Sequence, residues 1–176
     1  MLRHGMAVLG VAVMLACTAS ASVITIPIEQ GTPGSTVIVP VDIDVGTLTG
    51  IIAIDLQLSY DTTLLDLANS DVKLAGLTAT GWTLTSNVVD ASGTATIGLF
   101  NIDPLVGSPG QILELDFHIP ASVTTGSSAI NITATLNESA VSVTNGQVTV
   151  VPEPAVLSLL VLDFGVIGCR RAKRSL

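Results

Sequence analysis

The sequence predicts an all-β fold, a β-sandwich of nine strands with jelly-roll topology that lies between two terminal segments of a different kind. Three observations support this fold class. Valine, isoleucine, threonine and leucine occur in short runs, and glycine, proline, asparagine and aspartate separate these runs. No stretch of the middle region has helical periodicity. The runs recur at the short, even spacing typical of a sandwich.

The first strands are predicted from alternation of apolar and other residues. We expect strands over 23–28, 36–44 and 50–60. The second strand places one set of side chains inward: Val37, Val39, Val41 and Ile43. The third strand has Ile54, Leu56, Leu58 and Tyr60 on its inward face and Asp55, Gln57 and Ser59 on its outward face. Residues 61–65 break the alternation and predict a single helical turn, with two leucines folded over the core.

The rest of the middle region continues the same pattern of strands and turns. Further strands are expected over 72–75, 83–88, 94–100, 111–119, 129–135 and 147–151. Glycines mark the intervals between them, and no internal repeat or linker interrupts the series. Residues 22–150 are therefore predicted to form one domain, which is long enough to bury its own core.

The amino-terminal segment has the pattern of a secretory signal peptide. Arg3 precedes an apolar stretch over 6–16, and Ala19 and Ala21 supply the small residues of a cleavage site. Residues 1–21 are expected to be removed after Ala21. An alternative is a lipoprotein signal in which Cys17 is acylated.

The carboxyl-terminal segment, 151–176, has three parts in order. It begins with Val151, Pro152, Glu153 and Pro154, continues with an apolar stretch over 155–169, and ends with Arg170, Arg171, Lys173 and Arg174. Basic residues are retained on the inner side of a membrane, so this order predicts an outer stop, a membrane segment and an inner anchor. The stretch covers only about 22 Å of a hydrocarbon core of about 30 Å and contains Asp163. We therefore expect a transient membrane segment that is cleaved near 151–154.

Charge and cysteine content limit what the middle domain does. Five of the six basic residues and two of the fourteen acidic residues lie in the terminal segments, so residues 22–151 carry twelve carboxylates against Lys73 alone. Such a domain lacks the clustered basic residues that bind nucleic acid. Its acidity either attracts cations or a basic partner, or serves solubility alone. Cys17 and Cys169 both lie outside the domain, so no disulfide holds it.

No catalytic set is expected in the domain. His118 is its one histidine, it lies in an alternating strand where a solvent-facing position is expected, and there is no cysteine to act as nucleophile or zinc ligand. Carboxylates stand two apart in two places, as in the active sites of glycosidases, although such pairs also occur on acidic surfaces: Asp42 with Asp44, and Glu114 with Asp116. We predict that the protein is not an enzyme and needs no cofactor.

A calcium site is a weaker alternative. Asp61, Asp66 and Asp71 border a turn, and hard cations prefer oxygen ligands. The spacing is not that of an EF-hand, and aspartates that cap turns are the other explanation.

The middle domain resembles the cohesin domains of bacterial cellulosomes. The resemblance lies in the segments 34–41, 50–65, 110–117 and 146–150, which follow one another in the family's order. It implies a protein-docking module whose partner is a dockerin, a small calcium-bearing helical domain. Family members dock with a flat sheet face, and one contact is an Asp five positions before the Tyr of a Tyr-Asp step. Here that residue is Asp55, with Gln57 and Ser59 on the same face, and Ala53 stands where many members have Asn.

The carboxyl-terminal segment resembles the PEP-CTERM sorting signal. The resemblance implies an exosortase-type processing enzyme as a partner, export across the inner membrane of a bacterium, and a final place at the cell surface or outside the cell.

Two other functions are compatible with the sequence. Several carbohydrate-binding modules share the sandwich architecture and stack aromatic rings on sugars, which would make polysaccharide the ligand. In this domain Tyr60 and Phe117 fall on inward positions, and Trp82 is the one ring considered for solvent exposure, although core packing is the expected place for it. A structural component of the extracellular matrix is the third possibility, and the domain's Thr- and Gly-rich composition suits it.

Overall fold

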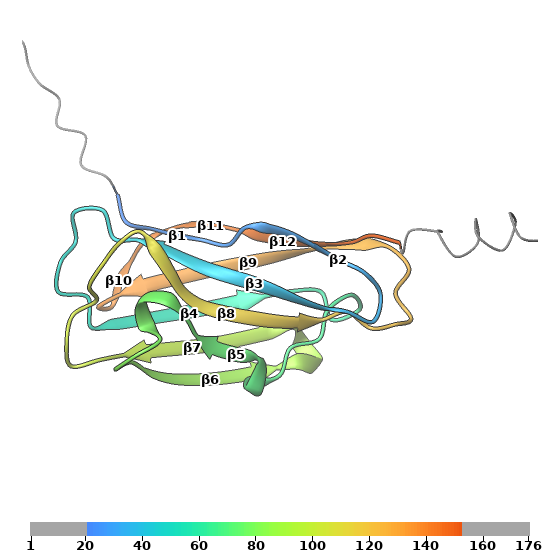
Figure 1. Cartoon of the computed structure of the whole chain (residues 1–176), viewed down its shortest axis with the longest axis horizontal. Coiled ribbons are helices and arrows are strands. Elements are labelled where there is room, and N and C mark those ends of the chain that lie inside the picture. Colours follow the sequence, from blue (N-terminus) through green and yellow to red (C-terminus); the bar gives the residue numbers. More distant parts are fainter. Residues whose placement is uncertain (1–20, 153–176) are drawn as a thin grey trace, which may run out of the picture.

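A computed structural model describes residues 21–152, which form two β-sheets packed face to face (Figure 1). One sheet has five strands: β1 (Val23–Thr25), β3 (Thr36–Asp44), β5 (Val72–Leu74), β8 (Gly110–His118) and β11 (Ser142–Thr144). The other has seven: β2 (Ile28–Gly31), β4 (Ala53–Ser59), β6 (Thr83–Val89), β7 (Thr94–Phe100), β9 (Gly126–Leu136), β10 (Ser139–Ala140) and β12 (Gly146–Val150). The predicted all-β sandwich is confirmed.

Both sheets are mixed. The five strands run in the order β11-β1-β3-β8-β5, and the seven-stranded sheet runs β2-β12-β9-β4-β7-β6, with β10 paired to β9. The pairs β1 with β11 and β2 with β12 are parallel, and the other pairs are antiparallel. In the described part of the chain, three short 3₁₀ helices join strands: η1 (Asn69–Asp71), η2 (Gly76–Thr78) and η3 (Asp90–Ser92).

The structure corrects the predicted strand count and the first strand. The segment 23–28 is not one strand, because β1 belongs to the five-stranded sheet and β2 to the other. Pro27 lies between them and has no N–H to donate to a ladder, so the chain leaves one sheet there and enters the other. The buried Ile26 side chain, 1% exposed, fills the crossing point. With β10 and β11 added, residues 21–152 contain twelve strands rather than nine.

Alternation places the core where the sequence predicts it. The inward residues of β3 are at most 6% exposed: Val37, Val39, Val41 and Ile43. Ile54, Leu56 and Leu58 of β4 are at most 3% exposed. Tyr60 and Phe117 meet edge to face between the sheets, with ring centroids 5.2 Å apart. The core is thus continuous from one sheet to the other.

The predicted helical turn after β4 is present. The Leu65 N–H donates to the Asp61 carbonyl at 3.0 Å, and the Leu65 side chain is fully buried in the core. The Asp61 carboxylate accepts hydrogen bonds from the Thr63 hydroxyl and the Thr63 N–H, and these bonds hold the pKa of Asp61 below its usual value. The polar residues of this segment therefore cap the turn.

Most of both terminal segments lies outside the described residues. The predicted signal peptide reaches the described chain only at Ala21, and the predicted sorting signal only at Val151 and Pro152. Within residues 21–152, no helix has the length and apolar character that a membrane crossing requires.

Candidate functional site

Strand β4 carries the predicted site residues on the outer face of the seven-stranded sheet. Because the even-numbered residues of β4 are buried, Asp55 and Gln57 point outward and are exposed, and Ser59 is half-buried on the same side. The three residues are therefore brought together, two apart along one strand. We call the outward side chains of β9, β4, β7 and β6 the β4 face.

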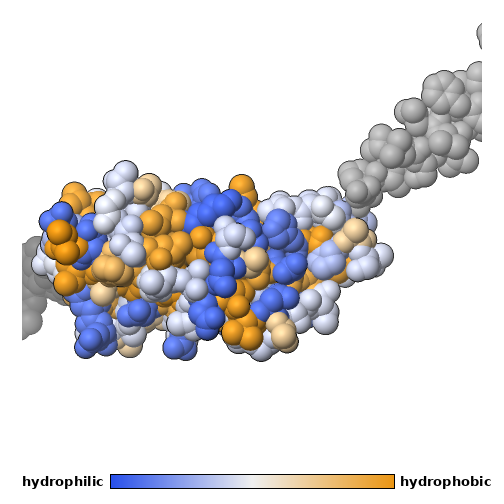
Figure 2. Space-filling model, turned by 90° about the horizontal axis from the view of Figure 1, so that it is seen from below, coloured by the Kyte–Doolittle hydropathy of each residue, from blue (hydrophilic) through white to orange (hydrophobic). Residues whose placement is uncertain are grey.

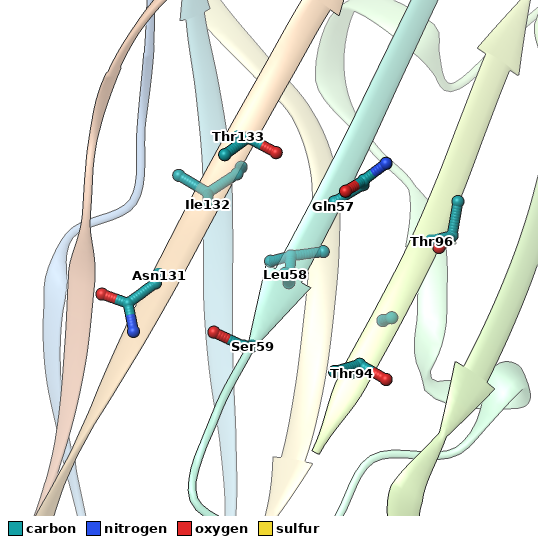
Figure 3. Close-up of a pocket in the computed structure, with 9 residues that line it drawn as sticks. Gln57, Leu58, Ser59, Thr94, Thr96, Asn131, Ile132 and Thr133 are labelled. Atoms are coloured by element: carbon teal, nitrogen blue, oxygen red, sulfur yellow. The ribbon is translucent and has the colours of Figure 1, made fainter. Parts of the chain in front are cut away.

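The sheet register arranges the β4 face in rows. Gln57 lies opposite Thr133 of β9 and Thr96 of β7. In the next row, Ser59 lies opposite Asn131 and Thr94, and Figure 3 shows both rows with their polar groups on one side of the sheet. Leu58 of β4 and Ile132 of β9 lie between the two rows, but their side chains point inward and are buried in the core. The result is a broad surface of small uncharged polar side chains.

Two open hollows lie on this face, one beside the other. The first is lined by residues of the two rows around Gln57 and Ser59 (Figure 3). The second is centred on Asp55 and Gln57 and reaches Thr135 of β9 and Ala140 of β10. Both are shallow depressions of the sheet rather than enclosed cavities, so they suit contact with another surface better than burial of a small ligand.

Gly98 leaves room beside the Asp55 carboxylate. It lies opposite Asp55 on one side and Thr85 of β6 on the other. A Cβ atom at position 98 would stand 2.8 Å from the Thr85 hydroxyl oxygen and 3.4 Å from Asp55 Oδ1. The absence of a side chain at this position therefore keeps the carboxylate open to a partner.

The polar groups of the three site residues are not used within the fold. Among residues 21–152, no hydrogen bond or ion pair involves the side chains of Asp55, Gln57 or Ser59. Asp55 is also the single carboxylate on strands β9, β4, β7 and β6. Other polar side chains of the face do have partners: Thr85 donates to the Gly98 carbonyl, Thr94 contacts Ser92, and Asn131 accepts from Asn145. The carboxylate of Asp55, with the free groups of Gln57 and Ser59 beside it, can therefore accept donors from a partner.

Asn137 fixes the start of β4 and was not predicted from the sequence. Its side-chain oxygen accepts the N–H groups of Ile52 and Ala53 at 3.0 and 3.1 Å, and its side-chain nitrogen donates to the Gly50 carbonyl at 2.9 Å. Its φ of 46° is left-handed, which asparagine tolerates better than most residues. Asn137 therefore positions the strand that carries the site.

The outer face of the five-stranded sheet is different in its chemistry. Here Lys73 pairs with Asp116, and that carboxylate raises the pKa of the lysine. His118 is exposed, as predicted, and its ring lies 2.8 Å from the Thr36 hydroxyl and 3.4 Å from an Asp71 oxygen. We call the outward side chains of β3, β8 and β5, together with Asp71, the β3 face.

The aspartates considered for calcium have structural partners. Asp61 caps its turn, and Asp71 Oδ2 accepts the Ala68 N–H at 3.0 Å in addition to its contact with His118. In the described part of the chain, no three metal-ligating side chains converge on one point. The turn-capping explanation is confirmed for Asp61 and Asp71.

Of the aromatic rings, Trp82 lies where it was expected and Phe100 does not. Trp82 is 8% exposed and packs in the core, as predicted. Phe100 at the end of β7 is instead the exposed ring, with 51% of its surface accessible. It stands opposite Ala53, in the outward row next to the row of Asp55 and Gly98. Phe100 ends an alternating strand and lies on the same side of it as Thr94 and Thr96. This alternation was the signal that could have identified Phe100 as an outward residue.

Solved structures with the same architecture come from several organisms. The sixth cohesin of scaffoldin B from Acetivibrio cellulolyticus, solved in complex with a Cel5 dockerin mutant, is 22% identical, with a TM-score of 0.58, and covers 74% of this chain and 99% of its own. The cohesin of an OlpA cohesin–dockerin complex from Clostridium thermocellum is 17% identical, with a TM-score of 0.62, and covers 75% and 100%.

A third structure shows that the fold extends beyond cellulosomes. The non-cellulosomal cohesin of the archaeon Archaeoglobus fulgidus is 20% identical, with a TM-score of 0.61, and covers 79% of this chain and 97% of its own. No curated protein matches the sequence. The family model of the cohesin domain matches residues 22–155. This chain therefore belongs to the cohesin domain family.

Proposed function

We propose that the protein is a non-catalytic docking module that binds a dockerin-type domain through the β4 face. The observation that carries the proposal is the set of free polar groups on that face, where Asp55, Gln57 and Ser59 face solvent without a partner among the described residues. Membership of the cohesin family and the complexes of its structural neighbours with dockerins support the choice of partner.

The shape of the β4 face supports a protein partner. Its hollows are shallow and open, and they follow the rows of threonine, asparagine and glutamine across three strands. Asp55 supplies one charge that can accept hydrogen bonds from a serine or threonine hydroxyl or from a basic side chain of the partner. Ala53 offers no side-chain hydrogen bond, so the partner must obtain its contacts from the rows of Asp55 and Gln57.

The proposal includes a cellular place for the module. The expected signal peptide and sorting signal would export residues 22–150, and an exosortase-type enzyme would process the tail near 151–154. The domain would then lie at the surface of a bacterial cell or outside it, where dockerin-bearing proteins assemble or degrade polysaccharide. Mass spectrometry of the mature protein should show the loss of residues 155–176, and a mature chain that retains them would contradict the processing step.

Docking can be tested with the dockerin modules encoded in the source genome. The fragment to test is 22–152, because it contains the whole described core. Isothermal titration calorimetry should find at least one dockerin that binds this fragment when calcium is present and does not bind it when a chelator has removed the calcium. Asp55→Ala should weaken that affinity at least tenfold, because it removes the one charged acceptor of the face. Glu114→Ala on the β3 face is the matched control and should leave affinity within twofold.

The other outcomes are equally clear. If none of the dockerins binds, or if Asp55→Ala and Glu114→Ala behave alike, the proposed use of the β4 face is wrong. Binding of polysaccharide by the same domain, with no dockerin bound, would favour the carbohydrate-binding alternative.

A further inference from the structure

Exposed apolar side chains gather at one end of the sandwich. Of the eight large apolar side chains that are exposed in the described residues, five lie in the loop before β4, at the end of β7 or in the loop after it: Leu48, Ile52, Phe100, Ile102 and Val106. Ile102 and Val106 are 90% and 83% exposed. These loops form the left end of the molecule in Figure 1, and hydrophobic atoms are visible among hydrophilic ones at the same end in Figure 2. We call this set the tip.

Hydrogen bonds hold the loops of the tip together. The Asn101 N–H donates to the Ile52 carbonyl at 3.0 Å, and the Leu105 N–H donates to the Ile51 carbonyl at 2.7 Å. Ser108 Oγ accepts the Val45 N–H at 2.9 Å and so connects the loop of Leu48 to the loop of Val106. The apolar side chains are therefore presented by a fixed backbone, which lowers the entropic cost of binding.

The tip is continuous with the β4 face. Phe100 and Ala53 are opposite one another in the register, and Asp55 and Gly98 form the next outward row along the same two strands. A partner that covers Asp55 and extends along β4 toward its start reaches Phe100 and then Ile52. The chain leaves the sandwich at the opposite end, because β12 ends at Val150 beside Gly126.

Charge at the tip indicates the chemistry of the partner. Asp103 follows Ile102 directly, Glu138 follows the Asn137 that holds Ile52, and both carboxylates are exposed. Between residues 22 and 151 the chain has one basic side chain, Lys73, which is paired with Asp116 on the β3 face. A second copy of this acidic chain would place carboxylates against carboxylates, so it is not the expected occupant. A partner whose apolar side chains are flanked by lysine or arginine would complement both the apolar side chains and the carboxylates of the tip.

We propose that the tip is a second contact surface that extends the docking face and binds a basic amphipathic helix of the docked partner. The apolar side of that helix would cover Ile102, Val106 and Phe100, and its basic residues would pair with Asp103 and Glu138. This inference rests on the proposed docking function for the identity of the partner, whereas the surface itself can be tested separately.

The first test uses the dockerin modules described above and a synthetic helix as probes. The helix carries leucine on one side and lysine beside it, and a matched peptide carries glutamate in place of lysine. In fluorescence anisotropy, residues 22–152 should bind the lysine peptide at least tenfold more tightly than the glutamate peptide. Ile102→Ser with Val106→Ser should weaken binding of the lysine peptide and of a docking dockerin about tenfold. Ile38→Ser, an exposed isoleucine on the β3 face, is the control and should change neither by more than twofold.

The second test removes the charges of the tip. Asp103→Asn with Glu138→Gln should weaken lysine-peptide binding about tenfold at low salt and less at high salt, because exposed charges are screened. Asp42→Asn with Glu114→Gln removes the same charge from the β3 face and should leave binding within twofold.

The outcomes separate this inference from the docking function. If a dockerin binds and the tip variants behave like their controls, the proposed role of the tip is wrong, whereas the proposed docking function is supported. If no dockerin binds but the lysine peptide binds and its affinity falls in the tip variants, the proposed docking function is wrong, whereas the tip is supported as a contact surface. Equal binding of the lysine and glutamate peptides would overturn the assigned chemistry.

Discussion

The charged groups of the β3 face and the site residues of the β4 face differ in whether they have partners within the fold. On the β3 face, Lys73 pairs with Asp116 and His118 contacts both Thr36 and Asp71, so the polar groups bind one another. On the β4 face, Asp55, Gln57 and Ser59 bind nothing within the described residues. Groups that are satisfied inside the fold stabilise it, whereas free groups on an open sheet are available to a partner.

The difference between the faces also appears in their charge. The strands of the β4 face carry Asp55 alone, whereas the β3 face has several carboxylates, including Asp42, Glu114 and Asp116. A mutation on one face should therefore change binding, and a mutation on the other should change stability. The following experiments test this separation in order of expected effect.

Filling the space beside Asp55 should have the largest effect. Gly98→Val places a branched side chain between Thr85 and Asp55, and we expect dockerin affinity to fall more than a hundredfold, about 3 kcal/mol. The backbone at Gly98 is extended, which valine adopts readily, but its Cβ would stand 2.8 Å from the Thr85 hydroxyl oxygen, so the Thr85 side chain must shift. The free energy of unfolding in urea should therefore fall by about 1–2 kcal/mol, less than the loss of binding. Ala129→Val, an outward position farther along β9, should leave affinity unchanged. Undiminished binding by Gly98→Val would show that the partner does not use this hollow.

Removing the lysine of the β3 face should affect stability instead of binding. Lys73→Met leaves the Asp116 carboxylate unpaired, and that side chain is only 13% exposed, with its Oδ1 already lacking a hydrogen-bond partner in the described residues. The free energy of unfolding should fall, with dockerin affinity unchanged. Asp55→Ala, measured in the same urea titration, should change stability by less than about 0.5 kcal/mol. The reverse pattern would contradict the assignment of roles to the faces.

Replacing the buried Tyr60 should have a smaller effect on stability, and this effect should depend on pH. Burial and the hydrogen bond from the Tyr60 hydroxyl to Asp90 raise the pKa of Tyr60 above its ordinary value. The folded tyrosine therefore stays neutral where the unfolded one ionises, so stability is complete below about pH 10 and falls as the pH rises above it. Tyr60→Phe should flatten the alkaline part of a stability–pH curve measured by chemical denaturation. An unchanged alkaline slope in that variant would assign the effect to other groups.

The sequence predicts much of the fold because alternation is a local signal. The bounds of β3 and β7 agree with the predicted strands, and β4 lies within its predicted range. The split between β1 and β2 was missed, because 23–28 is continuously strand-like and Pro27 was not used as a break. β10 and β11 are two and three residues long, which is too short for a period to be visible.

The site was predictable in part for the same reason. The outward direction of Asp55 and Gln57 follows from the period of two along β4. The neighbours that make the face, such as Gly98 and Thr133, depend on register between strands far apart in the chain. Asn137 contacts Ile52 from 85 positions away, so no local pattern reveals its role.

The central claim is that the partner binds the β4 face, and an NMR titration tests it most directly. Isotope-labelled residues 22–152 would be titrated with a dockerin that binds, and backbone amide shifts would be followed on both faces. We predict that the largest changes fall on Gln57, Thr96 and Thr133, while Ile38, Glu114 and His118 remain unchanged. Large changes on the β3 face with none on β4 would contradict the account.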